Sequence, residues 1–256
     1  MEKGKRTQRY NDKVVLVTAS ASGIGKAMAT RFAEEGATVI INSRKKENVD
    51  AAVKELTGRG LKAVGFPANV GNDKERQAMV EFIKEKYGKL DVLVPNAAVS
   101  VHMGKTLKTT AAEFDKTFDI NVKSVFLLAK ETYELLLKGT KPAILLVSSI
   151  AAYNGDDRLG IYSVTKTALL GLNKILAREL QDEGIRVNCL APGIIKTEFS
   201  GPLWKDKEQD AMDSLRLQRL GEVEDVANAA AFLCSEEADY IVGETILVAG
   251  SITQRL

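Results

Sequence analysis

The stretch KVVLVTASASGIGKAMATRFAEEGATVIINSRKK, residues 13–46, contains the pattern that decides the fold. It begins with an apolar, β-branched run, passes through a turn of small residues into a segment of helical period, and ends on a second apolar run. Nearly continuous apolar runs are typical of strands buried on both faces, as in a parallel sheet covered by helices. The stretch therefore predicts a strand–helix–strand unit with its first turn at the N-terminus of the helix.

The same alternation continues along the 256 residues of the chain. Strands are expected at residues 13–19, 37–43, 62–68, 90–96, 143–149, 185–191 and 244–250. Helices are expected at residues 23–35, 46–58, 72–87, 110–138, 160–182 and 222–235. No Pro-, Gly- or Ser-rich linker divides these units, so residues 1–256 are expected to form a single domain. The predicted fold class is α/β, a Rossmann-like doubly wound parallel sheet of about seven strands with helices on both faces.

One connection is much longer than the others. Roughly 28 residues separate the sixth expected strand from the next clear helix, well above ordinary connection lengths. We expect a substrate lid at about residues 193–220, with Phe199, Leu203 and Trp204 as candidate substrate contacts. A small helical appendage that packs its own apolar residues is the alternative.

The composition excludes several classes of function. Hydrophobic residues make up 45% of the chain, charged residues 27%, and the net charge is +2, so nucleic acid is not expected as a partner. No apolar run approaches the ~20 residues that a membrane span needs. Cys189 and Cys234 stand in apolar runs and read as core residues, and with the single histidine, His102, no metal site is expected.

The turn TASASGIG, residues 18–25, is a candidate phosphate site. Small residues allow a ligand to approach the backbone, and a helix N-terminus favours an anion. Ala19 and Ser22 stand where the dinucleotide pattern G-x-G-x-x-G would place glycine, so a Ser/Gly-rich helix cap is the alternative. The candidate cofactor-binding residues of this turn are Thr18, Ser20, Ser22, Gly23, Ile24 and Gly25.

The end of the second expected strand indicates which dinucleotide binds. An acidic residue there would accept hydrogen bonds from the ribose hydroxyls of NAD, but this chain has Ser43, Arg44 and Lys45. Arg44 could pair with a 2′-phosphate, which a carboxylate would repel. The charge therefore favours NADP (NADPH), with ordinary surface basic residues as the alternative.

Tyr162 and Lys166 stand four positions apart in the segment GIYSVTKTALLGL, residues 160–172, and so share one face of the expected helix. A cation beside a phenol stabilises the phenolate and is expected to lower its pKa. The spacing fits a tuned acid, and it also fits an ordinary surface pair.

Further short motifs follow the turn in a fixed order. They are PNAA (95–98), INV (120–122), SS (148–149), YSVTK (162–166) and APG (191–193). Together with TASASGIG they make the chain resemble the short-chain dehydrogenase/reductase family from about residue 12 to residue 250. Within that family it is similar to the peroxisomal NADP-dependent carbonyl and retinal reductases.

The resemblance implies a catalytic set of four residues. Tyr162 and Lys166 match the family's Y-x-x-x-K, and Ser149 stands thirteen positions before the tyrosine, as the family's serine does. Asn121 matches the asparagine of the family's proton relay. The resemblance also implies cofactor contacts at Asn69, Val70, Asn96, Ala97, Tyr162, Lys166, Pro192, Gly193, Ile195 and Thr197.

These residue types suit carbonyl reduction, because the carbonyl oxygen gains negative charge as hydride arrives and must be held and protonated. Ser149 could bind that oxygen, and Tyr162 could bind and protonate it, so both are also candidate substrate contacts. Departures from the family pattern are Ala19 and Ala98 in place of glycine, Pro95 at a strand end, and the polar loop 153–160. A non-catalytic NADP-binding sensor is the alternative to an NADP-dependent carbonyl reductase.

The family further implies a homotetramer. The final tripeptide Gln254-Arg255-Leu256 approximates the peroxisomal address S-K-L, with glutamine as the departure. Peroxisomes are therefore the expected location, with the cytosol as the alternative.

Overall fold

A computed structural model describes residues 8–155, 157–206, 208–214 and 217–250. Seven parallel strands form one sheet in the order β3-β2-β1-β4-β5-β6-β7. Their bounds are β1 Val14–Val17, β2 Thr38–Ser43, β3 Ala63–Pro67, β4 Val92–Val94, β5 Ala143–Val147, β6 Arg186–Pro192 and β7 Thr245–Val248. Each lies within or beside a predicted strand, so the expected parallel sheet of seven strands is confirmed.

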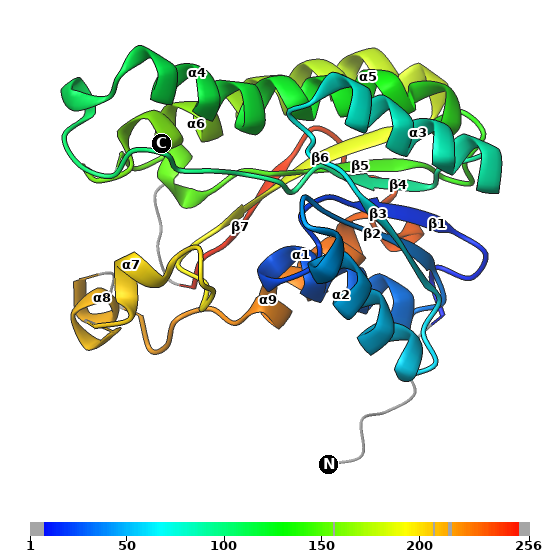
Figure 1. The fold of residues 1–256 in the computed structure, drawn as a ribbon, viewed down its shortest axis with the longest axis horizontal. Coiled ribbons are helices and arrows are strands. Elements are labelled where there is room, and N and C mark those ends of the chain that lie inside the picture. The colour runs from blue at the N-terminus through cyan, green and yellow to red at the C-terminus, as the bar shows by residue number, and fades with distance from the viewer. Residues whose placement is uncertain (1–7, 156, 207, 215–216, 251–256) are drawn as a thin grey trace.

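Helices cover both faces of this sheet (Figure 1). One face carries α1 (Gly23–Glu34), α2 (Lys46–Gly58) and α9 (Val223–Leu233), and the other carries α3 (Asp73–Tyr87), α5 (Ser124–Leu136) and α6 (Gly160–Leu180). Because successive side chains of a strand point to opposite faces, Val15 and Val17 of β1 enter one core cluster and Val14 and Leu16 the other. Because both faces of the strands are buried, their sequences do not alternate between apolar and polar residues.

The expected helix at 110–138 is interrupted by one wider, π-helical turn. Helix α4 (Ala111–Phe118) and α5 are joined by a π-helical turn, Asp119–Lys123, that includes Asn121. Turns of this kind insert one residue into the helical repeat and occur frequently at functional sites. The insertion changes the direction in which Asn121 projects from the helix.

The strand order places a crevice at the carboxyl edge of the sheet. From β1 the chain moves outward to β2 and β3, then crosses back so that β4 pairs with the other side of β1. The loops after β1 and β4 therefore leave in opposite directions, and a ligand crevice forms between them.

The described parts of residues 193–220 stand beyond this edge. They contain α7 (Gly201–Trp204) and α8 (Glu208–Ser214), which project beside the carboxyl ends of β6 and β7 (Figure 1). Their base is tied to the sheet, since the Gly193 N–H donates to the Val248 carbonyl at 3.0 Å and Ile195 bridges to Gly221. That this segment acts as a lid remains a prediction. None of the helices described in the structure is long and apolar enough to span a membrane.

Candidate functional site

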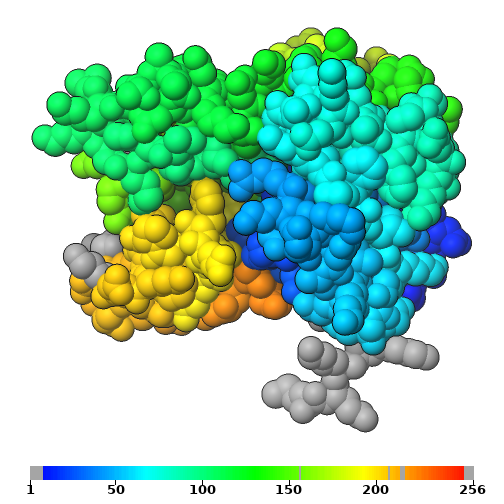
Figure 2. All heavy atoms as spheres, in the orientation of Figure 1, coloured from blue at the N-terminus to red at the C-terminus, as the bar shows by residue number. Residues whose placement is uncertain are grey.

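A cleft of 1260 Å³ lies at the switch point between β1 and β4. The surface is hollowed where the green segment of α4, the blue N-terminal units and the yellow segment of α7 meet (Figure 2). Its walls come from the turn after β1, the ends of β4, β5 and β6, the first turns of α6, and α7. The cleft therefore brings together motifs that are far apart in the sequence.

The turn after β1 has a shape that admits an anion. Ser22 is the N-cap of α1, yet its side chain makes no capping hydrogen bond, and the first helical turn contains no acidic residue. A methyl group added at Gly25 would press against the Ala19 carbonyl and the Asn96 side-chain nitrogen, so only glycine fits there. The uncapped N–H groups and the close backbone approach fit the pyrophosphate of a dinucleotide.

Thr18 and Ser20 belong to this turn but face away from the cleft. The buried Thr18 hydroxyl accepts from the Ala97 N–H at 3.0 Å, and the Thr18 carbonyl accepts from the Asn96 amide at 3.0 Å. The buried Ser20 hydroxyl donates to the Val17 carbonyl at 2.6 Å. Both side chains support the turn from behind.

The other predicted cofactor residues divide into two groups. Those that line the cleft are Ser22, Gly23, Ile24, Gly25, Asn96, Tyr162, Lys166, Pro192, Gly193, Ile195 and Thr197. Those that lie outside its lining are Thr18, Ser20, Ser43, Arg44, Lys45, Asn69, Val70 and Ala97. The second group sits mostly at the ends of β2 and β3, where an adenosine extending beyond the cleft would lie.

The basic pair after β2 is available to a ligand. Arg44 and Lys45 are exposed, and no ion pair holds either side chain within the part of the chain that the structure describes. Val70, in contrast, is buried in the core beneath α3, and the Asn69 carboxamide accepts from the Gly71 N–H at 3.1 Å.

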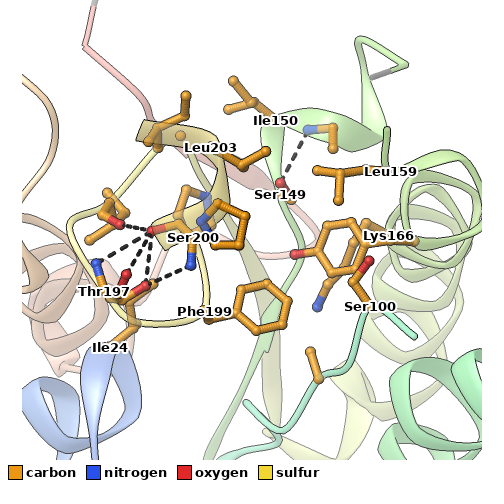
Figure 3. Close-up of a pocket in the computed structure, with 18 of the residues that line it drawn as sticks. Ile24, Ser100, Ser149, Ile150, Leu159, Lys166, Thr197, Phe199, Ser200 and Leu203 are labelled. Carbon is orange, nitrogen blue, oxygen red and sulfur yellow. Dashed lines mark hydrogen bonds between the residues drawn. The ribbon is translucent and has the colours of Figure 1, made fainter. Parts of the chain in front are cut away.

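The predicted catalytic side chains Ser149, Tyr162 and Lys166 all line the cleft. Ser149 begins the turn after β5, where its hydroxyl accepts from the Ala151 N–H at 3.2 Å, and Lys166 lies on the same side of the cleft (Figure 3). The Lys166 ammonium donates to the Val147 carbonyl at 2.7 Å and lies 5.5 Å from the centre of the Tyr162 ring. The i, i+4 spacing therefore places the phenol and the ammonium side by side, as predicted.

Burial shifts the pKa values of this pair in opposite directions. Burial raises the pKa of Tyr162 to about 12, and a hydrogen bond with the Ser149 side chain offsets only part of that rise. Burial lowers the pKa of Lys166 to about 8, against a smaller opposing effect of the Cys189 thiol. The expected lowering of the Tyr162 pKa is therefore wrong for the protein alone, because burial removes the phenolate from water and raises the pKa instead.

Asn121 lies behind the wall of the cleft and forms hydrogen bonds with Val99, which stands between two residues of the lining. Its fully buried carboxamide accepts from the Val99 N–H and donates to the Val99 carbonyl, both at 2.8 Å. It also donates to the Thr165 hydroxyl at 3.0 Å, and Thr165 in turn donates to the Tyr162 carbonyl at 2.6 Å. The structure thus connects Asn121 to the helical turn that carries Tyr162.

Of the three candidate substrate residues in the 193–220 segment, two line the cleft and one does not. Phe199 and Leu203 line the cleft, with the Phe199 ring 5.8 Å from that of Tyr162, but Trp204 does not line it. The Trp204 indole N–H instead donates to the Ser200 hydroxyl at 3.1 Å. Residues of the polar loop, Asp157 and Arg158, also line the cleft, whereas Asp156 lies outside the described residues.

Several cleft residues gave no signal in the sequence. They are apolar or small residues that stand beside the motifs, and they include Ser100, Met103, Ile150, Ala151, Leu159, Ile194 and Pro202. Apolar residues in loops resemble core residues until the fold shows which ones face a cavity. His102 lies outside the lining, where its ring contacts Glu113 at 3.7 Å. No cluster of potential metal ligands occurs among the described residues.

A family model, curated proteins and a solved structure all show similarity to this chain. Residues 18–253 match the family model described as enoyl-(acyl carrier protein) reductase. Dehydrogenase/reductase SDR family member 4 of Homo sapiens is 48% identical over 247 residues, which cover 96% of this chain and 89% of that protein. Tropinone reductase-like 3 of Erythroxylum coca is 44% identical over 253 residues, covering 97% and 96%. A solved short-chain type dehydrogenase/reductase from Mycobacterium ulcerans superposes with a TM-score of 0.90 at 32% identity, covering 95% of this chain and 90% of that one.

The lowered pKa of Lys166 predicts a specific pH dependence of stability. Between about pH 8 and the ordinary lysine value of 10.5, the unfolded chain binds this proton more tightly than the folded protein does. The stability that depends on Lys166 should therefore rise with pH across that range, by at most about 3 kcal/mol. Cys189 and Cys234, whose pKa values burial raises, contribute less stability as the pH rises over the same range in both proteins, so the rise should appear in the difference between the wild type and Lys166→Met when urea denaturation is measured at several pH values. Lys130→Met, at an exposed position of α5, is the control; equal pH profiles for all three proteins would contradict the prediction.

Proposed function

Because the chain belongs to the short-chain dehydrogenase/reductase family, we propose that it is an NADP-dependent carbonyl reductase that acts reversibly on aldehydes and ketones. Membership makes it an oxidoreductase with a nicotinamide dinucleotide cofactor. The observation that carries the more specific proposal is the meeting of Ser149, Tyr162 and Lys166 in one cleft beside the phosphate turn. Bound NADPH supplies the hydride, and the protein's residues hold and protonate the substrate.

In this proposal, Ser149 and Tyr162 bind the carbonyl oxygen, and Tyr162 is the general acid, or the base in the reverse direction. With a pKa of about 12, the Tyr162 phenol carries its proton at neutral pH and is in the acid form that reduction needs, although burial makes it a weaker acid than a free phenol. Lys166 would hold the ribose hydroxyls and stabilise negative charge on the phenol oxygen. The Asn121–Thr165 hydrogen bond supports the turn that carries Tyr162.

The cleft walls support substrates with an apolar body. Ile150, Leu159, Phe199 and Leu203 lie around Ser149 and Lys166 (Figure 3). We therefore propose α-dicarbonyls, aromatic ketones, retinal or 3-ketosteroids as the substrate classes. The test is oxidation of NADPH, followed by absorbance, with one representative of each class. Turnover of none of them, together with tight NADPH binding, would favour a non-catalytic NADP-binding sensor.

We also propose that the protein is a homotetramer. Phe126 of α5 and Val164 and Ile175 of α6 are exposed apolar side chains on neighbouring helices. Packing of these helices against a second copy would remove that apolar area from water.

Tyr162→Phe should abolish turnover while leaving NADPH binding intact. The substitution removes the acidic proton but keeps the ring that packs beside Phe199. We expect kcat to fall by about a thousandfold and the Kd for NADPH to change by less than about twofold. Tyr240→Phe, which alters a fully exposed tyrosine, should match the wild type. Substantial turnover in Tyr162→Phe would remove Tyr162 as the acid.

Arg44→Asp should shift cofactor preference from NADPH toward NADH. A carboxylate at this exposed position would repel a 2′-phosphate and accept hydrogen bonds from ribose hydroxyls. We expect the ratio of kcat/KM values for the two cofactors to change by about a hundredfold. Lys54→Asp, an exposed charge reversal on α2, is the control. An unchanged ratio in Arg44→Asp would exclude this site for the 2′-phosphate.

We also propose that the protein is peroxisomal, on the basis of Gln254-Arg255-Leu256. This tripeptide lies outside the described residues. A fluorescent fusion should lose its peroxisomal pattern when the three residues are removed. A cytosolic pattern in both fusions would support the alternative location.

A further inference from the structure

Asn42 is a buried polar residue outside the cleft that connects three segments of the candidate cofactor site. It lies on β2 and is only 1% exposed, and it stands directly before Ser43 and Arg44. Its side-chain nitrogen donates to the Phe66 and Ala68 carbonyls, each at 3.1 Å. The same carboxamide therefore ties the end of β2 to the segment that leads into Asn69.

Asn42 is equally tied to the phosphate turn. Its backbone N–H donates to the Ser20 hydroxyl at 3.0 Å, and its carbonyl accepts from the Ser20 N–H at 2.8 Å. Its side-chain oxygen accepts from the Ala19 N–H at 3.4 Å. The Ser20 hydroxyl completes the connection by donating to the Val17 carbonyl of β1. Asn42 and Ser20 thus hold the turn between the paired strands β1 and β2.

The turn needs such a support because of Ala19. This residue has a φ of 50°, in the left-handed region that is unfavourable for a side chain with a Cβ atom. Its carbonyl forms the wall against which Gly25 packs, and Ala19 itself lines the cleft. A relaxation of Ala19 would therefore change the shape of the surface that the pyrophosphate would contact.

We propose that Asn42 and Ser20 are positioning residues for NADPH, which hold Ala19 in its left-handed conformation and align the phosphate turn with the two segments that flank the adenosine. The inference rests on the proposed function, because it assigns the pair to the same cofactor site. Neither side chain lines the cleft, so both act through Ala19 and the strand ends. Their loss should weaken cofactor affinity and leave the chemical step unchanged.

The experiment compares Asn42→Ser and Ser20→Ala with the wild type, using full-length protein and NADPH as the titrant. Calorimetric titration should show Kd raised by about tenfold or more in both variants. KM for NADPH should rise in parallel, while kcat at saturating NADPH should remain within about twofold. Asn188→Ser is the matched control, because Asn188 is a buried strand asparagine that donates to the Ile241 carbonyl and accepts from the Glu244 N–H.

A second substitution tests the role of Ala19 directly. Glycine adopts the left-handed conformation without penalty, so Ala19→Gly should restore most of the NADPH affinity that Ser20→Ala loses. Ser20→Ala is the smaller change and supports this test even when Asn42→Ser fails to fold. A Kd in Ser20→Ala equal to that of the wild type, or no recovery on adding Ala19→Gly, would overturn the inference and leave the proposed function standing. Absence of NADPH binding by the wild type would overturn both.

Discussion

The structure depends on one constraint, which is that helices cover both faces of a parallel sheet. With both faces closed, backbone groups of the strands can meet a ligand only at the edges of the sheet. The strand order opens the carboxyl edge between β1 and β4, where the chain leaves in opposite directions. The phosphate turn, the Ser149 turn and the start of α6 all reach this opening, so motifs separated by more than a hundred residues share one cleft.

Burial also sets the electrostatics of the cleft. Lys166 and Tyr162 are adjacent, yet the pKa of the phenol rises and that of the ammonium falls, because each loses the water that stabilises its charged form. The phenol therefore holds its proton firmly in the protein alone. The protonated form is the one that can donate to a carbonyl oxygen as hydride arrives, but a higher pKa makes that donation harder. The same burial makes the lysine a group that titrates near the physiological range.

The phosphate turn shows how a departure from a glycine pattern is accommodated. Ala19 keeps the left-handed backbone that glycine adopts freely. Its N–H donates to the Asn42 side-chain oxygen, and the next residue, Ser20, is hydrogen-bonded to the Asn42 backbone. Gly25, by contrast, cannot be replaced without a clash against Ala19 and Asn96. Position 19 therefore accepts a methyl side chain and position 25 does not, because the surroundings of the two positions differ.

The sequence by itself determined the parallel sheet and the set of motifs that meet at its edge. Apolar runs indicate strands that are buried on both faces, and a spacing of four residues indicates side chains on one face of a helix. Both patterns are local properties of the chain. Only the tertiary structure decided which way individual side chains point. It turned Thr18 and Ser20 into the protein, directed Trp204 toward Ser200, and gave Asn42, which no motif marked, its contacts with three segments. It also reversed the expected pKa shift of Tyr162, because the cost of burying a charge depends on everything packed around it and not on one neighbour in the helix.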